Sequence, residues 1–232
     1  MRKFAALLLV LLAFGARAED PDILWKLVGG KCVPEAQQGV PPEPCAKVDL
    51  ARGQAVLKDR TGVAQYLIIP TTRVTGIEDP AVLADGGGFA VGWETRAAVE
   101  AKLGRPLPRD AVSLAVNSIN GRSQNQLHIH VDCLDAEVRA AMRGVAVGEA
   151  WAPFPAPLAG HRYLARFVPG ETLDGINPFR LLADNVGGPL GAWTLAAVGA
   201  TSTAGTPGFI LLAQNDAFAS AEQLQDHACH AY

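Results

Sequence analysis

Polar and apolar residues alternate without interruption along residues 126–133, which read Gln-Leu-His-Ile-His-Val-Asp-Cys. A period of two is that of a β-strand, in which successive side chains point to opposite faces. One face would carry the polar residues Gln126, His128, His130 and Asp132. The other would carry the apolar residues Leu127, Ile129, Val131 and Cys133. We predict a half-buried strand at the centre of the fold, with two imidazoles in a row on its polar face.

The rest of the N-terminal half alternates between strand-like and helix-like spacing. We expect a hairpin over residues 54–58 and 65–69, an apolar strand over 110–116, and helices over 21–28, 89–103 and 135–147. Gly29 and Gly30 are expected to end the first helix, and Asp135 to cap the third. The polar loop over 117–125 leads into the histidine strand.

Prolines at 153, 155 and 157 mark a connector to a C-terminal part. There the pattern predicts a strand over 161–167, a short helix over 178–184, a second hairpin over 193–198 and 209–213, and a final helix over 220–229. Ser220 and Gln223 have the spacing of a capping box for that last helix. These elements predict an α+β fold: an antiparallel sheet with helices on one face, a core over about 19–150 and a smaller β-rich extension over about 158–232.

The first eighteen residues have the pattern of a secretory signal peptide. Arg2 and Lys3 precede an apolar run over residues 4–14, and Ala16-Arg17-Ala18 is a typical cleavage site. The run is much shorter than the about twenty residues that a spanning helix needs. We predict an exported protein cleaved after Ala18, with an uncleaved segment acting as a short anchor as the alternative.

Charge and cysteine content narrow the classes of protein. The formal net charge is −3 and the basic residues are scattered, so no basic patch for nucleic acid is expected. Four cysteines in an exported chain favour two disulfides. Of the three connectivities we favour Cys32–Cys45, which closes a proline-rich loop, and Cys133–Cys229, which ties the C-terminal helix to the site strand. Zinc is disfavoured because the chain has no C-x-x-C spacing.

Three interpretations fit the histidine strand. A neutral imidazole is a good nucleophile toward phosphorus, and Asn117, Arg122 and Ser123 in the preceding loop could hold phosphate oxygens. Alternatively, H-x-H on a strand is a common pair of metal ligands, which Asp132, His161, His227 or His230 could complete. The third interpretation is structural, with the polar face of an edge strand turned to solvent.

The motif Gly-Arg-Ser-x-x-Gln-x-His-x-His, beginning at Gly121, resembles the active-site signature of the histidine-triad superfamily of nucleotide hydrolases and transferases. The resemblance implies a histidine-triad-like (HIT-like) fold, with His128 as the nucleophile and His130 as the third member of the triad. Gln126 occupies the place of the first histidine and can only orient or hydrogen-bond. Ser123 matches the phosphate-contacting residue, and Asn117 the asparagine near the nucleotide. An offset alignment would make His130 the nucleophile.

More of the chain is similar to exported bacterial CDP-diacylglycerol diphosphatases. The similar segments are residues 32–34, 56–60, 65–67, 111–118, 121–133, 160–166 and 225–229. This resemblance implies hydrolysis of CDP-diacylglycerol to CMP and phosphatidate in phospholipid metabolism, without a cofactor, in a periplasmic protein associated with the inner membrane surface. Lys58 and His161 lie in similar segments and are candidate substrate-binding residues, with a solvated lysine and a strand-edge histidine as the alternatives. The competing functions are an exported metal-binding protein using His128 and His130, or a hydrolase of soluble nucleotides.

Overall fold

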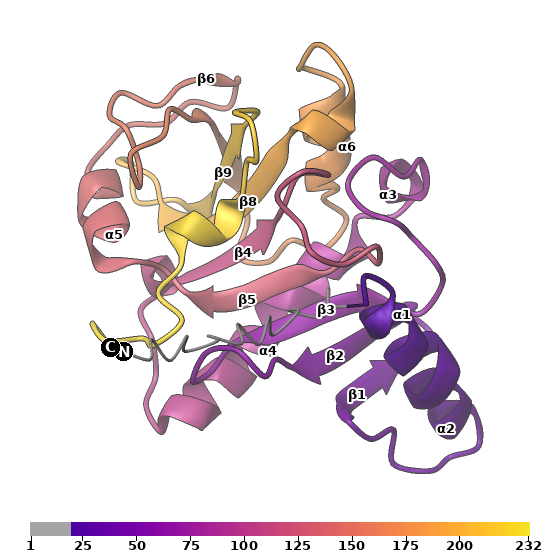
Figure 1. Cartoon of the computed structure of the whole chain (residues 1–232). Coiled ribbons are helices and arrows are strands. Elements are labelled where there is room, and N and C mark those ends of the chain that lie inside the picture. The colour runs from indigo at the N-terminus through magenta and orange to yellow at the C-terminus, as the bar shows by residue number, and fades with distance from the viewer. Residues whose placement is uncertain (1–19) are drawn as a thin grey trace, which may run out of the picture.

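A computed structural model describes residues 20–232, so the predicted signal peptide lies outside the described residues. The architecture is α+β, as expected, and is built on one antiparallel sheet (Figure 1). The strands lie in the order β1-β2-β3-β5-β4-β8-β9-β7-β6. Their bounds are β1 Cys45–Asp49, β2 Gln54–Lys58, β3 Tyr66–Pro70, β4 Val112–Val116, β5 Ile129–Cys133, β6 Ala152–Pro153, β7 Leu164–Pro169, β8 Thr194–Thr201 and β9 Pro207–Gln214.

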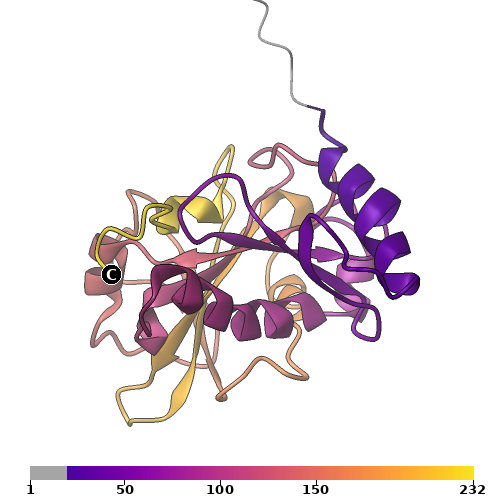
Figure 2. The same cartoon turned by 90° about the horizontal axis from the view of Figure 1, so that it is seen from below.

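Helices cover both faces of the sheet, not one face as expected. The α-helices are α1 Ile23–Leu27, α2 Val33–Gln37, α3 Ala81–Ala84, α4 Gly87–Leu103, α5 Ala136–Met142 and α6 Pro178–Ala183. A π-helical turn, η1, spans Val28–Cys32. The 3₁₀ turns are η2 Arg109–Ala111, η3 Leu190–Ala192 and η4 Ala221–Leu224. Figure 2 shows the sheet between α4 on one side and α1–α2 and η4 on the other. We call the second side the cleft face.

The hydrophobic core follows the alternation of the strands. Ile68, Leu114 and Ile129 point to the α4 side and belong to the largest apolar cluster. On the cleft face, one cluster lies under α1–α2 and contains Leu57 and Leu67. A separate cluster on this face lies under α5 and η4, and contains the buried residues Ala115, Leu134, Ala196, Val198 and Leu224. The cleft face therefore has two apolar coverings with a gap over the middle of the sheet.

The strand predicted over 126–133 begins only at Ile129, so Gln126 and His128 lie in the segment that leads into β5. β5 lies at the middle of the sheet, between β3 and β4. In its register His130 is opposite Leu67 on one neighbour and Ala115 on the other. Every residue of β5 is buried, including the polar ones. The prediction of a half-buried strand was therefore wrong, and an edge strand with solvent-facing histidines is excluded. Alternation alone does not reveal whether other segments cover the polar face.

Three predicted local boundaries also differ. The first helix continues through Gly29 and Gly30 as a π-helical turn into α2. Gly29 lies against the ring of Trp25, and a Cβ there would come 2.6 Å from a ring atom. Part of the expected loop between Cys32 and Cys45 is thus helical. The helix that begins after Asp135 ends at Met142 rather than near 147, before the left-handed Gly144.

The expected final helix is reduced to the 3₁₀ turn η4. Ser220 does not cap it, because its hydroxyl donates to Asn117 Oδ1 at 3.0 Å. A tertiary hydrogen bond therefore replaces the local one that the capping-box spacing predicted.

Both predicted disulfides, Cys32–Cys45 and Cys133–Cys229, are confirmed. The second joins the end of β5 to the C-terminal segment across a sequence separation of 96 residues. No helix within residues 20–232 combines the length and apolar character needed to cross a bilayer.

The loop before the histidine strand packs closely against the C-terminal segment. Ser118 Oγ donates to the carbonyl oxygen of Ala219 at 2.7 Å, and a Cβ on Gly121 would lie 2.1 Å from the same oxygen. Only glycine allows this approach, so Gly121 holds residues 219–222 close to β5.

We therefore expect Gly121→Ala to lower the free energy of unfolding by about 1–3 kcal/mol, since backbone must move to relieve the clash. Urea denaturation followed by circular dichroism measures this. Gly30→Ala is the matched control, because its Cβ would meet nothing within 4 Å, and alanine in a helical turn should leave stability equal or higher. Equal stability of Gly121→Ala and the unaltered protein would contradict the close packing.

Candidate active site

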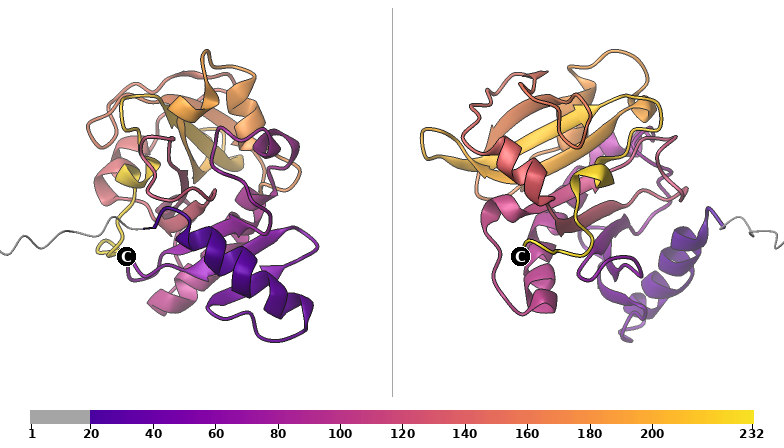
Figure 3. Two further views of the ribbon diagram at one scale, coloured as in Figure 1. Left: turned by 45° about the vertical axis from the view of Figure 1, so that its right-hand side comes forward. Right: turned by 60° about the vertical axis from the view of Figure 1, so that its left-hand side comes forward.

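A cleft of about 610 Å³ opens over β5 between the two apolar coverings. Figure 3 shows α1–α2 and the C-terminal segment apart from one another on this face of the sheet. The polar lining of the cleft comprises Lys58, Asp59, Arg60, Thr61, Asn117, Ser123, Gln124, His128, His130 and Glu222. Its volume is within the range of small-molecule sites. The cleft therefore brings together most of the residues that the sequence selected.

His128 is held in one tautomer by its own backbone neighbour. Its Nδ1 lies 2.7 Å from the carbonyl oxygen of Gln126, which can only accept, so Nδ1 carries the proton. The lone pair of the neutral ring is then on Nε2. Burial lowers the pKa of His128, with the hydrogen bond to Gln126 opposing that effect. The ring is thus neutral near pH 7, with Nε2 as a nucleophilic nitrogen.

His130 packs edge-to-face against His128, with ring centroids 4.7 Å apart. Two groups approach its Nδ1: the amide nitrogen of Gln65 at 2.9 Å and Glu222 Oε1 at 3.1 Å. An unprotonated Nδ1 accepts from Gln65, and a protonated one donates to Glu222, so the two contacts stabilise alternative tautomers. Burial and then the neighbouring histidines lower the pKa of His130 well below its usual value. This ring is also neutral near pH 7.

Glu222 is positioned by Asn117. The Asn117 Nδ2 donates to Glu222 Oε2 at 2.5 Å, and its Oδ1 accepts from Ser220 Oγ and from the Ala221 amide. Both ends of the Asn117 amide are thereby used within the protein. Asn117 lines the cleft, as the predicted phosphate contact requires, and in addition it positions a carboxylate against His130.

A second carboxylate–imidazole pair lies beside His130. His227 Nδ1 donates to Asp132 Oδ2 at 2.8 Å, and the other oxygen of Asp132 accepts from the Cys133 amide. The hydrogen bond to Asp132 raises the pKa of His227, whereas burial raises that of Asp132. This pair connects the C-terminal segment to β5 next to the Cys133–Cys229 disulfide.

The remaining predicted site residues divide into two groups. Ser123 and Lys58 line the cleft, and Lys58 Nζ also donates to the carbonyl oxygens of Asp59 and Gly62. Burial lowers the pKa of Lys58. The structure leaves three others out of the lining: the side chains of Gln126, Arg122 and His161.

Each of these three has partners elsewhere. The Gln126 amide donates to the carbonyl oxygens of Pro70 and Thr72 and accepts from the Val74 amide, so only its backbone oxygen contacts His128. Arg122 is 8% exposed, pairs with Glu78 at 2.6 Å, and lies behind His128 beside a small void. His161 precedes β7, four strands from β5, and contacts Asp216.

The sequence did not identify three residues of the site. Gln65 and Glu222 contact His130, and Glu222 and Arg60 line the cleft. Gln65 and Arg60 lie in segments that are similar to the CDP-diacylglycerol diphosphatases, and this similarity could have identified them. Glu222 had none, since its role depends on the close approach of residues 219–222 to the loop at Gly121.

The structure does not assemble a metal site around the histidine pair. Within residues 20–232, the side chains that bring three ligand atoms within 4.8 Å of one another are Asp132, Cys133 and Cys229. Both sulfurs are in a disulfide and provide no thiolate. His161, His227 and His230 contact Asp216, Asp132 and Asp226 instead of joining His128 as ligands.

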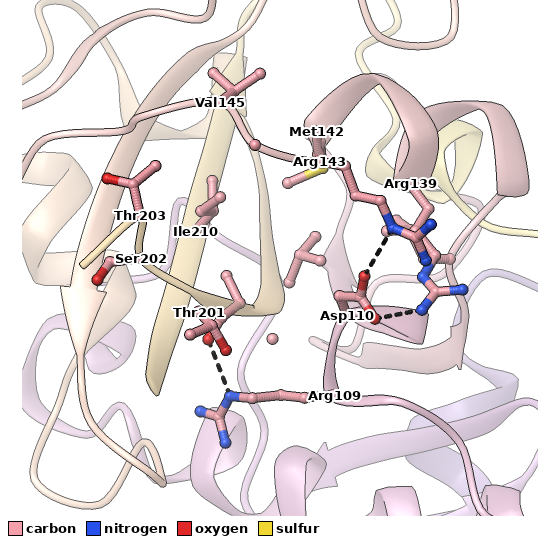
Figure 4. A pocket seen from close by; sticks show the side chains of 15 residues that line it. Arg109, Asp110, Arg139, Met142, Arg143, Val145, Thr201, Ser202, Thr203 and Ile210 are labelled. Atoms are coloured by element: carbon pink, nitrogen blue, oxygen red, sulfur yellow. Dashed lines mark hydrogen bonds and ion pairs between the residues drawn. The ribbon is translucent and has the colours of Figure 1, made fainter. Parts of the chain in front are cut away.

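A second cavity of about 450 Å³ lies between α5 and strands β8 and β9 (Figure 4). Arg139 and Arg143 pair with Asp110, and Arg109 donates to backbone carbonyl oxygens including that of Ala200. No histidine is among its lining residues. Its cations are engaged in the fold, so the His128 cleft is the better candidate for chemistry.

Comparison with known proteins defines the class. Residues 19–232 match a model for a family of hydrolases described as CDP-diacylglycerol pyrophosphatase. A Yersinia pestis protein named CDP-diacylglycerol pyrophosphatase is 39% identical over 239 residues, covering 96% of this chain and 91% of that one. The chain belongs to the CDP-diacylglycerol pyrophosphatase family.

We expect the pKa values of three histidines to differ from the ordinary value of 6.5, two of them downward and one upward. His128 and His130 are expected to titrate below it and His227 above it, because burial dominates in the pair and Asp132 dominates at His227. Glu222→Gln should lower the pKa of both His128 and His227, since the carboxylate raises both. Nitrogen-15 spectra of labelled histidine measure each pKa.

The matched control is Glu149→Gln, an exposed carboxylate outside the cleft, which should leave these pKa values unchanged. A pKa of His128 above 6.5, or one that rises in Glu222→Gln, would contradict this account of the site.

Proposed function

We propose that the chain hydrolyses the pyrophosphate of CDP-diacylglycerol to CMP and phosphatidate through a covalent intermediate on His128. The observation that carries the proposal is the hydrogen bond from His128 Nδ1 to the Gln126 carbonyl, which leaves Nε2 unprotonated in a cleft of suitable size. The name of the Yersinia pestis relative supports the substrate. The resemblance of the histidine strand to the histidine-triad signature supports the nucleophile.

The reaction takes two displacements. His128 Nε2 attacks the cytidylyl phosphorus, the bond to the bridging oxygen breaks, and phosphatidate leaves with that electron pair. Water then attacks the same phosphorus, the phosphorus–nitrogen bond breaks, and CMP is released. The electron pair of the broken phosphorus–nitrogen bond returns to Nε2, so His128 is neutral again, and the proton lost by the attacking water passes to solvent.

Cationic and hydroxyl groups surround the place of attack. Lys58, Arg60 and Ser123 line the cleft, and we assign them to the phosphate oxygens, where negative charge develops. We assign His130 and Glu222 to positioning of the His128 ring and of the attacking water. Gln126 contributes through its backbone oxygen, and Arg122 through the positive charge behind His128.

The proposed biological setting follows from the substrate and the N-terminus. CDP-diacylglycerol is a membrane lipid, so we place the enzyme in phospholipid metabolism at a membrane surface. The signal-like residues 1–18 support export, and the bacterial relative supports a bacterial setting, so we propose a periplasmic location at the inner membrane. The oxidised state of all four cysteines is compatible with that compartment.

A product assay tests the function. The purified chain should release CMP and phosphatidate in equal amounts from CDP-diacylglycerol in mixed micelles, faster than it cleaves a soluble dinucleotide. Faster cleavage of the dinucleotide would favour a hydrolase of soluble nucleotides. Stoichiometric bound metal whose removal abolishes function would favour the metal-binding alternative.

Substitution separates the two histidines. His128→Ala should lower turnover by at least about a thousandfold, because it removes the nucleophile. His130→Ala should lower it by about a hundredfold and leave measurable activity, because it removes a supporting group. Rapid quenching with substrate labelled at the cytidylyl phosphorus, followed by fragment mass spectrometry, should place CMP on His128. The control is His230→Ala, an 84% exposed side chain outside the cleft, and label on His130 would show that the offset alignment is correct.

A further inference from the structure

All apolar side chains that line the His128 cleft lie on one side of it. They are Ile23, Leu24, Leu27, Pro44, Leu57 and Leu67, which we call the apolar wall. The wall comes from α1, β2, β3 and the turn before β1, all on the β3 side of the histidine strand. Ser123 and His128 come from the segment that leads into β5, and Glu222 comes from η4, which contacts β4. Further polar lining, residues 58–61, comes from the end of β2 and the turn after it. The cleft is therefore amphipathic, with one continuous apolar wall and polar groups around the rest of its lining.

The wall is the exposed surface of an otherwise sealed cluster. Val28, Ala55 and Ile69, deeper in the same cluster, are completely buried. Leu57 and Leu24 keep 7% and 8% of their surface in the cleft, and Ile23 is 38% exposed. Burial of apolar surface lowers the free energy by about 25 cal/mol per Å², so an apolar ligand that covers this surface would be bound favourably.

The position of the wall is fixed relative to the nucleophile. Gln124 Oε1 accepts from the Leu24 amide at 3.4 Å, its Nε2 donates to the Asp20 carbonyl at 3.2 Å, and the Asn125 amide donates to the Pro21 carbonyl at 2.6 Å. These bonds join α1 to the loop that carries Ser123. A ligand held by Ser123 and His128 is thus presented to the wall without rearrangement of the helix.

We propose that the apolar wall binds the glycerol and the first acyl carbons of the lipid, an inference that rests on the proposed function. A pyrophosphate that straddles His128 has a polar nucleoside on one side and diacylglycerol on the other, and the wall matches only the second. Because the cleft must also hold the nucleotide, the ends of the acyl chains extend beyond it. After the first displacement, phosphatidate is the product on the wall side.

The experiment has a binding arm and a turnover arm. In the binding arm, methyl spectra of Ile23 and Leu27 are recorded with monomeric dihexanoyl phosphatidate and with glycerol 3-phosphate, using the exposed Ile119 as an internal reference. The lipid should shift Ile23 and Leu27 and bind at least about tenfold more tightly than glycerol 3-phosphate. In the turnover arm, kcat/KM for CDP-dihexanoylglycerol should exceed that for CDP-glycerol by a similar factor.

Ile23→Gln should reduce both preferences by about fivefold or more, because glutamine keeps a helix-compatible chain but places an amide in the wall. It should lower the turnover of CDP-glycerol by a smaller factor than that of CDP-dihexanoylglycerol. Val40→Gln, a 50% exposed position outside the cleft, should change nothing and serves as the matched control.

Each outcome is decisive for one proposal. Equal binding of the two phosphates, shifts that require vesicles rather than monomeric lipid, or equal losses on both substrates in Ile23→Gln would overturn the acyl assignment. Absence of turnover on both CDP compounds, with selective lipid binding retained, would overturn the proposed function and support the wall as a lipid site.

Discussion

Enclosure of two imidazoles at an interior strand is the constraint on which the rest of the site depends. His130 lies on β5 between two hydrogen-bonded neighbours and His128 directly precedes that strand, and both are more than nine-tenths buried. Removal from water disfavours the charged ring, so burial is the largest influence on both pKa values. A backbone carbonyl then selects the tautomer of His128 without adding a charge. The fold thus keeps nucleophilic nitrogen available near pH 7.

That enclosure requires a cover, which the last residues of the chain supply. Asn117, Ser118 and Gly121 bring residues 219–222 against the loop before β5, and the Cys133–Cys229 disulfide fixes the far end of the segment. Between these attachments lie Glu222 and His227, the two groups that contact His130 and Asp132. The packing of the C-terminal segment therefore determines which charged groups lie beside His130 and Asp132.

The parts of the site that follow local rules could be predicted from the sequence. A period of two predicted that His128 and His130 lie on one side, and their ring centroids are 4.7 Å apart, although the strand itself begins only at Ile129. Both disulfides were predicted correctly. Glu222 could not be predicted, since Ser220 and Gln223 favour a helix by local spacing, whereas the Ser220 hydroxyl bonds Asn117, 103 residues away. Gln65 contacts His130 only through the pairing of β3 with β5. Such pairings depend on topology, which local periodicity does not contain.

Gln126 stands where the histidine-triad signature has its first histidine, and the proposed reaction gives a physical explanation for this difference. A general acid is needed when the leaving group is a strong base, but phosphatidate leaves as a phosphate monoester, whose second pKa is about 6. It can depart near pH 7 with little proton transfer. The side chain of Gln126 is accordingly bonded to the 70–74 loop, and its only contact with His128 is the backbone oxygen. Under this reaction, residue 126 orients His128 through its backbone oxygen and is not required as an acid catalyst.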